Sequence, residues 1–216
     1  MTDLPLSALS HDALRQLLQS RLHGSEVPDA DTPMQIAGIA PEQQAQVAHL
    51  LSALRVPAAV LVPIVNRADG LTVLFTERAS HLKHHAGQIS FPGGRIEVSD
   101  AGPLAAALRE TEEEIGLARA HVELLGYLQP HYIFTGYCVT PVVALVQPHF
   151  KLQLDSSEVA DVFEVPLDYL LDPAHHQARE RQIGDITALV YDLPYGERHI
   201  WGATAGMLMS LYRLLS

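Results

Sequence analysis

The chain has 216 residues, 48% of them hydrophobic and 18% charged, so it is long enough for one large domain with a buried core and too apolar to be disordered throughout. Its net charge of −11 argues against nucleic acid and anionic membranes as partners, and an anionic substrate therefore needs a local basic patch or metal cations. A single cysteine, Cys138, excludes an intramolecular disulfide and favours a reducing compartment, which we expect to be the cytoplasm.

The first part of the chain predicts two helices, which we interpret as an N-terminal helical extension over residues 1–55. Leucines recur at helical spacing over residues 11–22, where Ser10 is placed to cap the helix and Gly24 to end it. A second helix is expected over residues 41–54. This extension carries no motif that indicates a function.

From residue 56 onward the chain predicts strands, and we assign residues 56–216 to a single domain. The first strand, residues 56–65, is also the most apolar run, and it is too short to span a bilayer. An Asp-Gly pair at 69–70 indicates a turn, and an apolar helix is expected over residues 203–215. Strands mixed with helices, without regular βαβ alternation, favour a layered α/β or α+β fold. Further strands are expected at residues 71–77, 122–128, 138–146, 162–165 and 188–193.

The most informative stretch, residues 87–117, is a Gly-Gly loop followed by an acidic helix that begins near Pro103 and ends at Gly116. Like charges one turn apart repel by roughly 0.2–0.5 kcal/mol per pair, so a merely solvated helix gains nothing from clustering them. Oxygen ligands without His or Cys suit Mg²⁺ or Mn²⁺, which can neutralise phosphate and activate water for pyrophosphate hydrolysis. The alternative is a charged surface helix in which Arg109 pairs with an acidic side chain one turn on. Three carboxylates fall within about one turn of this helix: Glu110, Glu113 and Glu114.

The same helix is expected to bury one face and to expose another. Glu112 points away from the three carboxylates and is interpreted as solvated. The face assigned to the core consists of Leu104, Leu108, Thr111 and Ile115.

This stretch resembles a Nudix box, the motif of the Nudix hydrolase family, and reads RETEEEIGL at residues 109–117. The general family has a glutamate where Asp100 stands, one residue fewer before the arginine, and an aliphatic residue in place of Thr111. These departures, together with the run LFTERASHLKHHAGQISFPGG, resemble the coenzyme A pyrophosphatase subfamily, although Phe75 replaces a leucine and Lys83 an arginine. The resemblance covers roughly residues 56–215. The matching signature residues are Thr76, Arg78, Ala79, Lys83, Gly87, Phe91, Pro92, Gly93 and Gly94.

The resemblance implies an α/β/α sandwich with a mixed sheet, and a pyrophosphohydrolase that uses Mg²⁺ or Mn²⁺ to split coenzyme A or its derivatives into adenosine 3′,5′-bisphosphate and 4′-phosphopantetheine. It also implies that Arg109 orients a carboxylate and that Gly93 and Gly94 let the backbone approach the metal and the pyrophosphate. The implied metal ligands are Glu110, Glu113 and Glu114.

The resemblance leaves the general base open between Glu113, Glu114 and the later Glu158, which precedes a strand. A dedicated base can also be dispensable, because metal binding lowers the pKa of a water. Glu97 and Asp100 are weaker candidates for a second metal, and Asp100 is alternatively a helix cap.

Basic residues upstream of the box are candidates for substrate contacts. Arg78 and Lys83 can hold the phosphates of an anionic nucleotide, although a surface ion pair is an alternative for Lys83. The histidines at 81, 84 and 85 have no acidic or Cys partner nearby in sequence, so we expect a polar loop in which His85 is at most a substrate contact. Cys138 and Trp201 are expected in the core.

Two other functions compete with coenzyme A hydrolysis. One is hydrolysis of another nucleoside diphosphate derivative, such as ADP-ribose or a dinucleotide. The other is a noncatalytic nucleotide-binding domain, against which the complete arginine and glutamate set of the box counts. A small-molecule nucleotide of the coenzyme A class is the expected partner, and a homodimer is left open.

Overall fold

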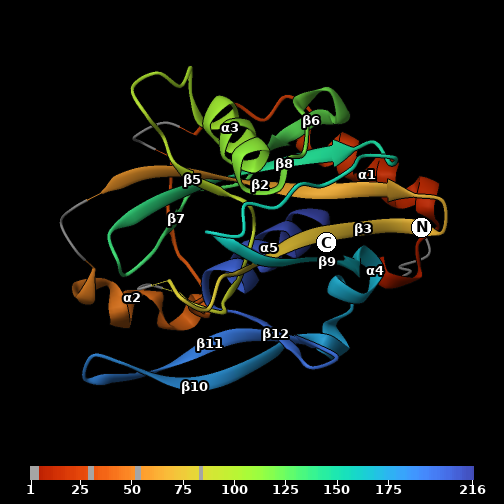
Figure 1. Cartoon of the computed structure of the whole chain (residues 1–216). Coiled ribbons are helices and arrows are strands. Elements are labelled where there is room, and N and C mark those ends of the chain that lie inside the picture. Colours follow the sequence, from red (N-terminus) through yellow and green to blue (C-terminus); the bar gives the residue numbers. More distant parts are fainter. Residues whose placement is uncertain (1–4, 29–31, 52–54, 83–84) are drawn as a thin grey trace.

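The central element of the fold is a nine-stranded mixed sheet, seen in the computed structural model of the chain, which describes residues 5–28, 32–51, 55–82 and 85–216 (Figure 1). Its strands are β1 (Gln35–Ile36), β2 (Val56–Arg67), β3 (Gly70–Arg78), β4 (Ile89–Ser90), β5 (Gly93–Arg95), β6 (Val122–Tyr127), β7 (His131–Tyr132), β8 (Tyr137–Val146) and β9 (Val159–Pro166). They run in the order β1-β7-β8-β2-β3-β4, while β5 pairs with β2, β6 with β8, and β9 with β3.

The middle of this sheet is buried on both faces, as its long apolar runs predict. β2 runs parallel to β8 over ten residue pairs and antiparallel to β3, which it meets through the predicted turn. Alternate residues of β2 enter two different hydrophobic clusters: Ala58, Val62 and Ile64 enter one, and Ala59, Leu61 and Val65 the other. Two buried faces require helices on both sides of the sheet.

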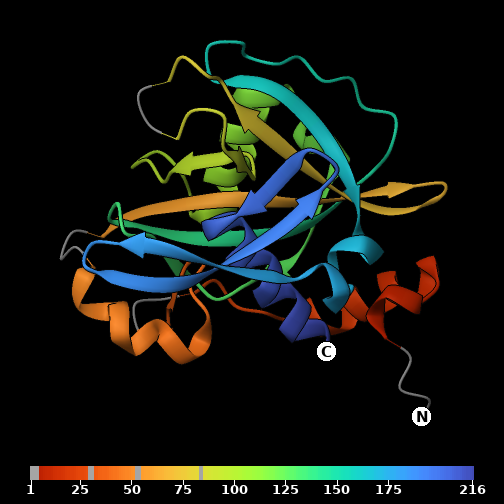
Figure 2. The same ribbon diagram turned by 90° about the horizontal axis from the view of Figure 1, so that it is seen from below.

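Helices supply those two outer layers. α3 (Pro103–Ile115) covers one face, whereas α1 (His11–Leu22) and α5 (Gly202–Leu215) pack on the other, so the chain has the expected α/β/α arrangement (Figures 1 and 2). Below α5 in Figure 1 lies a second, three-stranded antiparallel sheet of β10 (Gln177–Ile183), β11 (Ile186–Tyr195) and β12 (Arg198–Trp201). Two strands of this sheet contact α5, which therefore lies between the two sheets.

The N-terminal segment is only partly as predicted. α1 is confirmed: the Ser10 hydroxyl accepts a hydrogen bond from the Ala13 amide, and Gly24 follows the helix in the left-handed conformation. The continuous helix expected over residues 41–54 is wrong, because the described part forms three short pieces: η2 (Pro41–Gln43), α2 (Gln44–Val47) and η3 (Ala48–Leu50). Val47 is the one residue of these pieces that is buried, so no apolar stripe holds them together as one helix.

The N-terminal helix α1 packs into the hydrophobic core of the sheet. Leu14, Leu18 and Leu22 of α1 belong to the same cluster as Ile64 of β2 and Met207 of α5. Short helices complete the described structure: η1 (Leu6–Ala8), η4 (Arg119–His121), α4 (Leu167–Leu170) and η5 (Pro173–His175). Within the described ranges, no helix is long and apolar enough to cross a membrane.

The core face predicted for α3 is confirmed. Thr111 and Ile115 are buried, and Leu104 and Leu108 are half-buried and pack against the hydrophobic cluster that also contains Ala106 and Ala107. One packing expectation needs correction. Trp201, expected in the core, is 36% exposed. Its ring lies under the Arg181 guanidinium instead, 5.1 Å from the ring centre.

Candidate functional site

The site is built where β3 separates from β2. β3 pairs only with the last four residues of β2, and β5 takes the place beside residues 58–60 of β2. β5 therefore lies in the gap between two long strands, with α3 packed against it (Figure 1). Because the Gly-Gly pair forms β5 and the glutamates lie on α3, this packing brings the two halves of the sequence motif together.

Both glycines of β5 are required by contacts. The Gly93 amide donates a hydrogen bond to Glu114 Oε2 at 3.2 Å, and a Cβ atom on Gly93 would lie 2.3 Å from the Ala59 carbonyl oxygen. A Cβ atom on Gly94 would lie 2.5 Å from the carboxyl carbon of Glu110. Two glutamates of α3 thus lie directly on the backbone of β5, a closeness that a side chain on either glycine would prevent.

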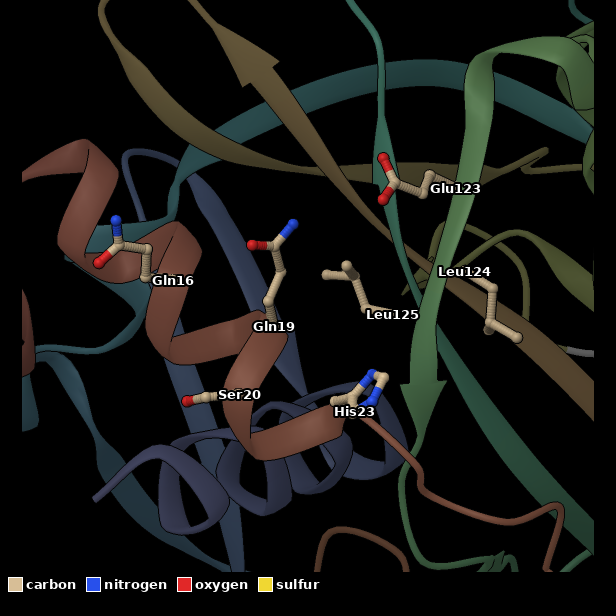
Figure 3. A pocket seen from close by; sticks show the side chains of 7 residues that line it. All are labelled: Gln16, Gln19, Ser20, His23, Glu123, Leu124 and Leu125. Carbon is tan, nitrogen blue, oxygen red and sulfur yellow. The ribbon is translucent and has the colours of Figure 1, made fainter.

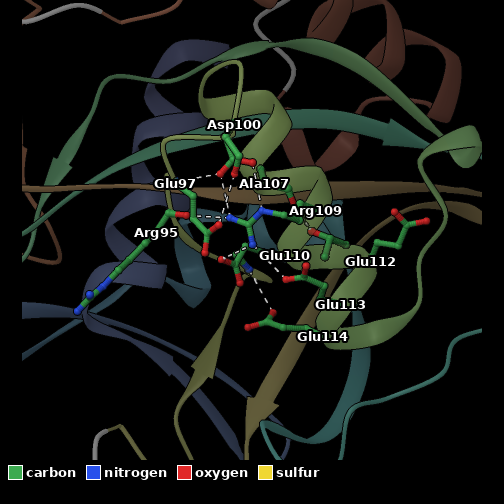
Figure 4. Close-up of polar contacts among 12 residues, drawn as sticks. Arg95, Glu97, Asp100, Ala107, Arg109, Glu110, Glu112, Glu113 and Glu114 are labelled. Carbon is green, nitrogen blue, oxygen red and sulfur yellow. Dashed lines mark hydrogen bonds and ion pairs between the residues drawn. The ribbon is translucent and has the colours of Figure 1, made fainter.

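Arg109 lies at the centre of a network of ion pairs with carboxylates of α3 and of the loop before it (Figure 4). Its Nε and Nη2 atoms donate to the two carboxylate oxygens of Asp100 at 3.1 and 2.9 Å. Its Nη1 atom donates to Glu110 at 2.9 Å and to Glu113 at 3.1 Å. The ion pair between Arg109 and Glu113 that is expected for a charged surface helix is present. Arg109 also binds Glu110 and, through Asp100, the loop that precedes α3.

Asp100 is not a helix cap. Gly102 occupies the N-cap position of α3, and no side chain caps it. The hydrogen bonds from Arg109, and then that from the Glu97 amide, hold the pKa of the Asp100 carboxyl below its usual range. Glu97 itself is exposed on the same loop. Both carboxylate oxygens of Asp100 therefore accept hydrogen bonds from donors of the protein.

Glu114 is the most unusual titratable group of the site. Its side chain is 6% exposed, and its pKa is raised to about 8, chiefly because burial disfavours the charged form. The negative charges of Glu158 and Glu110 contribute to this increase, whereas the Gly93 amide and the charge of Arg78 oppose it. Two residues far away in the sequence, Arg78 and Glu158, therefore act electrostatically on the same carboxyl.

The pKa of Glu110 is raised as well. Burial raises its pKa, Arg109 opposes this, and the charges of Glu113 and Glu158 add to the increase. The backbone explains why Glu158 lies here, because its carbonyl accepts a hydrogen bond from the Ala79 amide at 2.8 Å just after β3. His81 Nε2 and the Ser157 carbonyl, 3.1 Å apart, link the same two loops.

The donor set fits a hard divalent cation. The carboxylates supply only oxygen ligands, and Glu110 and Glu114 carry pKa values raised by burial, which an added positive charge would reverse. Among the described side chains, no group of three His, Cys, Asp or Glu residues is already arranged around one point. The Glu113 side chain is 61% exposed and pairs with Arg109.

Other predicted contacts are less well connected to the cluster. Lys83 and His84 lie outside the described residues. His85 is exposed, and its Nδ1 lies 2.8 Å from the Gln88 side-chain oxygen. Glu112 is paired with Arg119 away from the other glutamates, as expected. Cys138, expected in the core, is half-buried, and its thiol contacts the Met34 sulfur at 3.4 Å.

An open groove elsewhere on the molecule contains none of these residues. It has a volume of about 530 Å³ and lies between α1 and β6 (Figure 3). Its lining mixes polar and apolar side chains: Gln16, Gln19, Ser20, His23, Glu123, Leu124 and Leu125. The carboxylate cluster on α3 and β5 is therefore the better candidate for chemistry.

The fold is an α/β/α sandwich around a mixed sheet, and the site is a carboxylate centre formed by a glycine loop and a helix. The model of the NUDIX domain family matches residues 55–185. The chain is 41% identical over 155 residues to the uncharacterized Nudix hydrolase NudL of Escherichia coli strain K12, which covers 71% of this chain and 80% of that protein. It is 39% identical over 168 residues to NudL of Yersinia pestis strain Pestoides F, covering 78% of this chain and 84% of that protein.

Among solved structures, a MutT/nudix family protein from Enterococcus faecalis is similar with a TM-score of 0.46 at 16% identity, covering 82% of this chain and 70% of that one. The chain belongs to the Nudix hydrolase family. It is a pyrophosphohydrolase, an enzyme that hydrolyses a phosphoric anhydride. Nudix hydrolases generally use divalent metal ions and small nucleotide substrates.

Proposed function

We propose that the chain is a Mg²⁺- or Mn²⁺-dependent pyrophosphohydrolase that cleaves coenzyme A or its derivatives into adenosine 3′,5′-bisphosphate and 4′-phosphopantetheine. The observation that carries this proposal is the FPGG signature, whose two glycines contact Glu114 and Glu110 directly. The signature that resembles coenzyme A pyrophosphatases is thus part of the carboxylate centre. In this proposal the catalytic unit is residues 56–216; of the described residues that precede it, α1 packs on its core and β1 joins its sheet.

In this proposal Glu110, Glu113 and Glu114 hold the cation. Bound there, the cation neutralises phosphate charge and lowers the pKa of a water. Arg109 positions Glu110 and Glu113 through its Nη1 atom and is itself fixed by Asp100. Glu113, which is exposed and paired with Arg109, would turn from that pair to hold the cation.

Chain residues also serve the reacting groups. Glu158, whose charge acts on both Glu110 and Glu114, accepts the proton of the attacking water as general base. Arg78, whose charge acts on Glu114, holds a phosphate oxygen, and Lys83 and His85 extend this contact along the loop after β3. Gly93 and Gly94 let Glu114 and Glu110 lie against the backbone of β5, and in this proposal the diphosphate binds beside that backbone.

The test is a substrate panel with Mn²⁺ in which products are identified by mass spectrometry. The panel contains coenzyme A, acetyl-coenzyme A, 3′-dephospho-coenzyme A, ADP-ribose and a diadenosine polyphosphate. We expect the highest kcat/KM for coenzyme A or its acyl form, with adenosine 3′,5′-bisphosphate as a product. An equal or higher kcat/KM for dephospho-coenzyme A or ADP-ribose would remove the coenzyme A assignment and leave the pyrophosphohydrolase.

A further inference from the structure

Arg95, the residue after the Gly-Gly pair, has its backbone and its side chain in two different places. Its carbonyl oxygen accepts a hydrogen bond from Arg109 Nη2 at 3.1 Å, so its backbone is attached to the carboxylate cluster. Its guanidinium points away from Glu110, Glu113 and Glu114 (Figure 4). The side chain of Arg95 therefore belongs to a different place from that cluster.

The register of β5 shows which place this is. Gly94 pairs with Ala59, which belongs to the hydrophobic cluster between the sheet and α3. Arg95 pairs with Ala58, which belongs to the hydrophobic cluster on the other face of the sheet. Since successive strand residues point to opposite faces, the Arg95 side chain lies on the face opposite α3. The two sites are thus separated by the thickness of a single strand.

Tyr137 holds the Arg95 guanidinium in position. The Arg95 Nε and Nη2 atoms donate to the Tyr137 hydroxyl oxygen at 3.0 and 2.7 Å, and the guanidinium carbon lies 5.4 Å from the ring centre. Within the described part of the chain, no acidic side chain forms an ion pair with Arg95. A guanidinium has five N–H donors, so a fixed and exposed face of this one is left for a ligand.

We propose that Arg95, positioned by Tyr137, binds a phosphate of the substrate other than the two of the diphosphate. The diphosphate is cleaved at the carboxylates on the α3 side, and an anion on the opposite face must belong to a group farther along the substrate. A phosphate on the ribose of an adenine nucleotide meets this description. The inference deepens the proposed function, on which it rests, because coenzyme A carries such a phosphate.

The experiment compares ligands that differ only in that phosphate. Adenosine 3′,5′-bisphosphate, adenosine 2′,5′-bisphosphate and AMP are titrated calorimetrically into the protein with Mg²⁺. We expect wild type to bind the 3′,5′-bisphosphate about 10- to 100-fold more tightly than AMP, the range that a charge-assisted hydrogen bond provides. Arg95→Gln should bind AMP as wild type does and lose this preference. A preference for the 2′,5′-bisphosphate that depends equally on Arg95 supports the phosphate site and reassigns its position on the ribose.

Matched variants separate binding from structure. Arg119→Gln removes an exposed arginine that pairs with Glu112 and makes no contact with Arg95 or Tyr137, and it should keep the preference. Tyr137→Phe removes the hydroxyl that fixes the guanidinium and should reduce the preference less than Arg95→Gln does. Melting temperatures show that the variants fold, and Arg95→Lys should keep part of the preference because it retains the charge.

Three results would overturn the proposal: no preference in wild type, an unchanged preference in Arg95→Gln, or an equal loss of affinity for AMP and for the bisphosphate. Turnover is measured separately for coenzyme A and dephospho-coenzyme A. Failure to hydrolyse coenzyme A would overturn the proposed function, whereas the binding comparison decides the role of Arg95 without turnover.

Discussion

Glu114 combines burial with a hydrogen bond to a backbone amide, and this makes its charge costly when no cation is bound. A carboxyl whose pKa is higher in the folded than in the unfolded chain lowers stability as pH rises from the unfolded to the folded pKa. For Glu114 this window runs from about 4.3, the ordinary glutamate value, to about 8. In EDTA we therefore expect the free energy of unfolding to decline across this window, and Glu114→Gln to remove most of its contribution.

Urea unfolding at pH 5 and pH 8 measures this contribution. Glu114→Gln should be the more stable protein at pH 8, with a smaller difference at pH 5. Glu112→Gln, which changes a glutamate on the exposed face of the same helix, serves as the control and should follow wild type. If wild type and Glu114→Gln change in parallel between the two pH values, burial does not perturb Glu114 as described.

Glu113 and Glu114 are also the residues most directly tested by catalysis. A ligand or base stabilises charge mainly in the transition state, so its loss lowers turnover more than folding. We expect Glu113→Gln and Glu114→Gln each to lose turnover by about two orders of magnitude or more at saturating metal, while both variants remain folded. Near wild-type turnover in both variants would exclude them from the chemistry.

Gly94 separates a local contact from general stability. An alanine Cβ there meets the carboxyl end of Glu110, a flexible group that can move aside, so the fold should survive while Glu110 is displaced. Gly94→Ala should therefore lose most of its turnover with a small change in melting temperature. Gly196→Ala is the opposite control, because Gly196 has φ of +60° in open space and its substitution strains the backbone far from Glu110. Loss of turnover in both variants alike would contradict this contact.

At the scale of elements, α1 shows that the N-terminal segment contributes to the main core. Leu18 is fully buried in the cluster shared with β2 and α5, and truncating such a leucine typically costs about 2–5 kcal/mol. Leu18→Ala should therefore lower the stability of the whole chain in one cooperative transition. Thermal unfolding followed by circular dichroism and by loss of activity provides the measurement. Activity that melts at the wild-type temperature while helicity is lost earlier would show that the extension folds independently.

Elements that the sequence predicts correctly are those whose pattern is sufficient to identify them. β2 and β8 are long apolar runs, and α3 has a proline at its start and a left-handed glycine at its end. β10 carries no such signal, because its residues are polar and exposed and only pairing with β11 defines it. The short strands β4 and β5 are likewise defined by their partners.

The site divides in the same way. Glu110, Glu113 and Glu114 are neighbours on one helix, so their spacing alone brings them together. The contacts of Asp100 with Arg109, and the closeness of Glu158 and Arg78 to Glu114, depend on loops that meet only in the folded chain. The family resemblance predicts roles for Glu158 and Arg78, whereas no pattern in the sequence indicates the contact between Arg95 and Tyr137.

At the scale of the whole molecule, the chain has a net charge of −11. We expect a divalent cation to stabilise it by binding at the carboxylate site rather than by general screening of this charge. An ion that binds only the folded state adds about 2.7 kcal/mol at a hundredfold excess over its dissociation constant. Mn²⁺ should raise the melting temperature of wild type and raise that of Glu114→Gln clearly less, relative to EDTA at fixed ionic strength. Equal shifts in the two proteins would mean that Glu114 is not a ligand.

The place of Asp100 in a loop has a consequence for how such chains diverge. Its side chain reaches Arg109 from the segment before Gly102, so we expect that the number of residues between β5 and α3 can change by one while the helix keeps its position against the Gly-Gly pair. On this view the extra residue ahead of Arg109 and the shorter acidic side chain compensate each other. A search that requires a fixed interval at this point of the motif would overlook chains whose three-dimensional arrangement is the same.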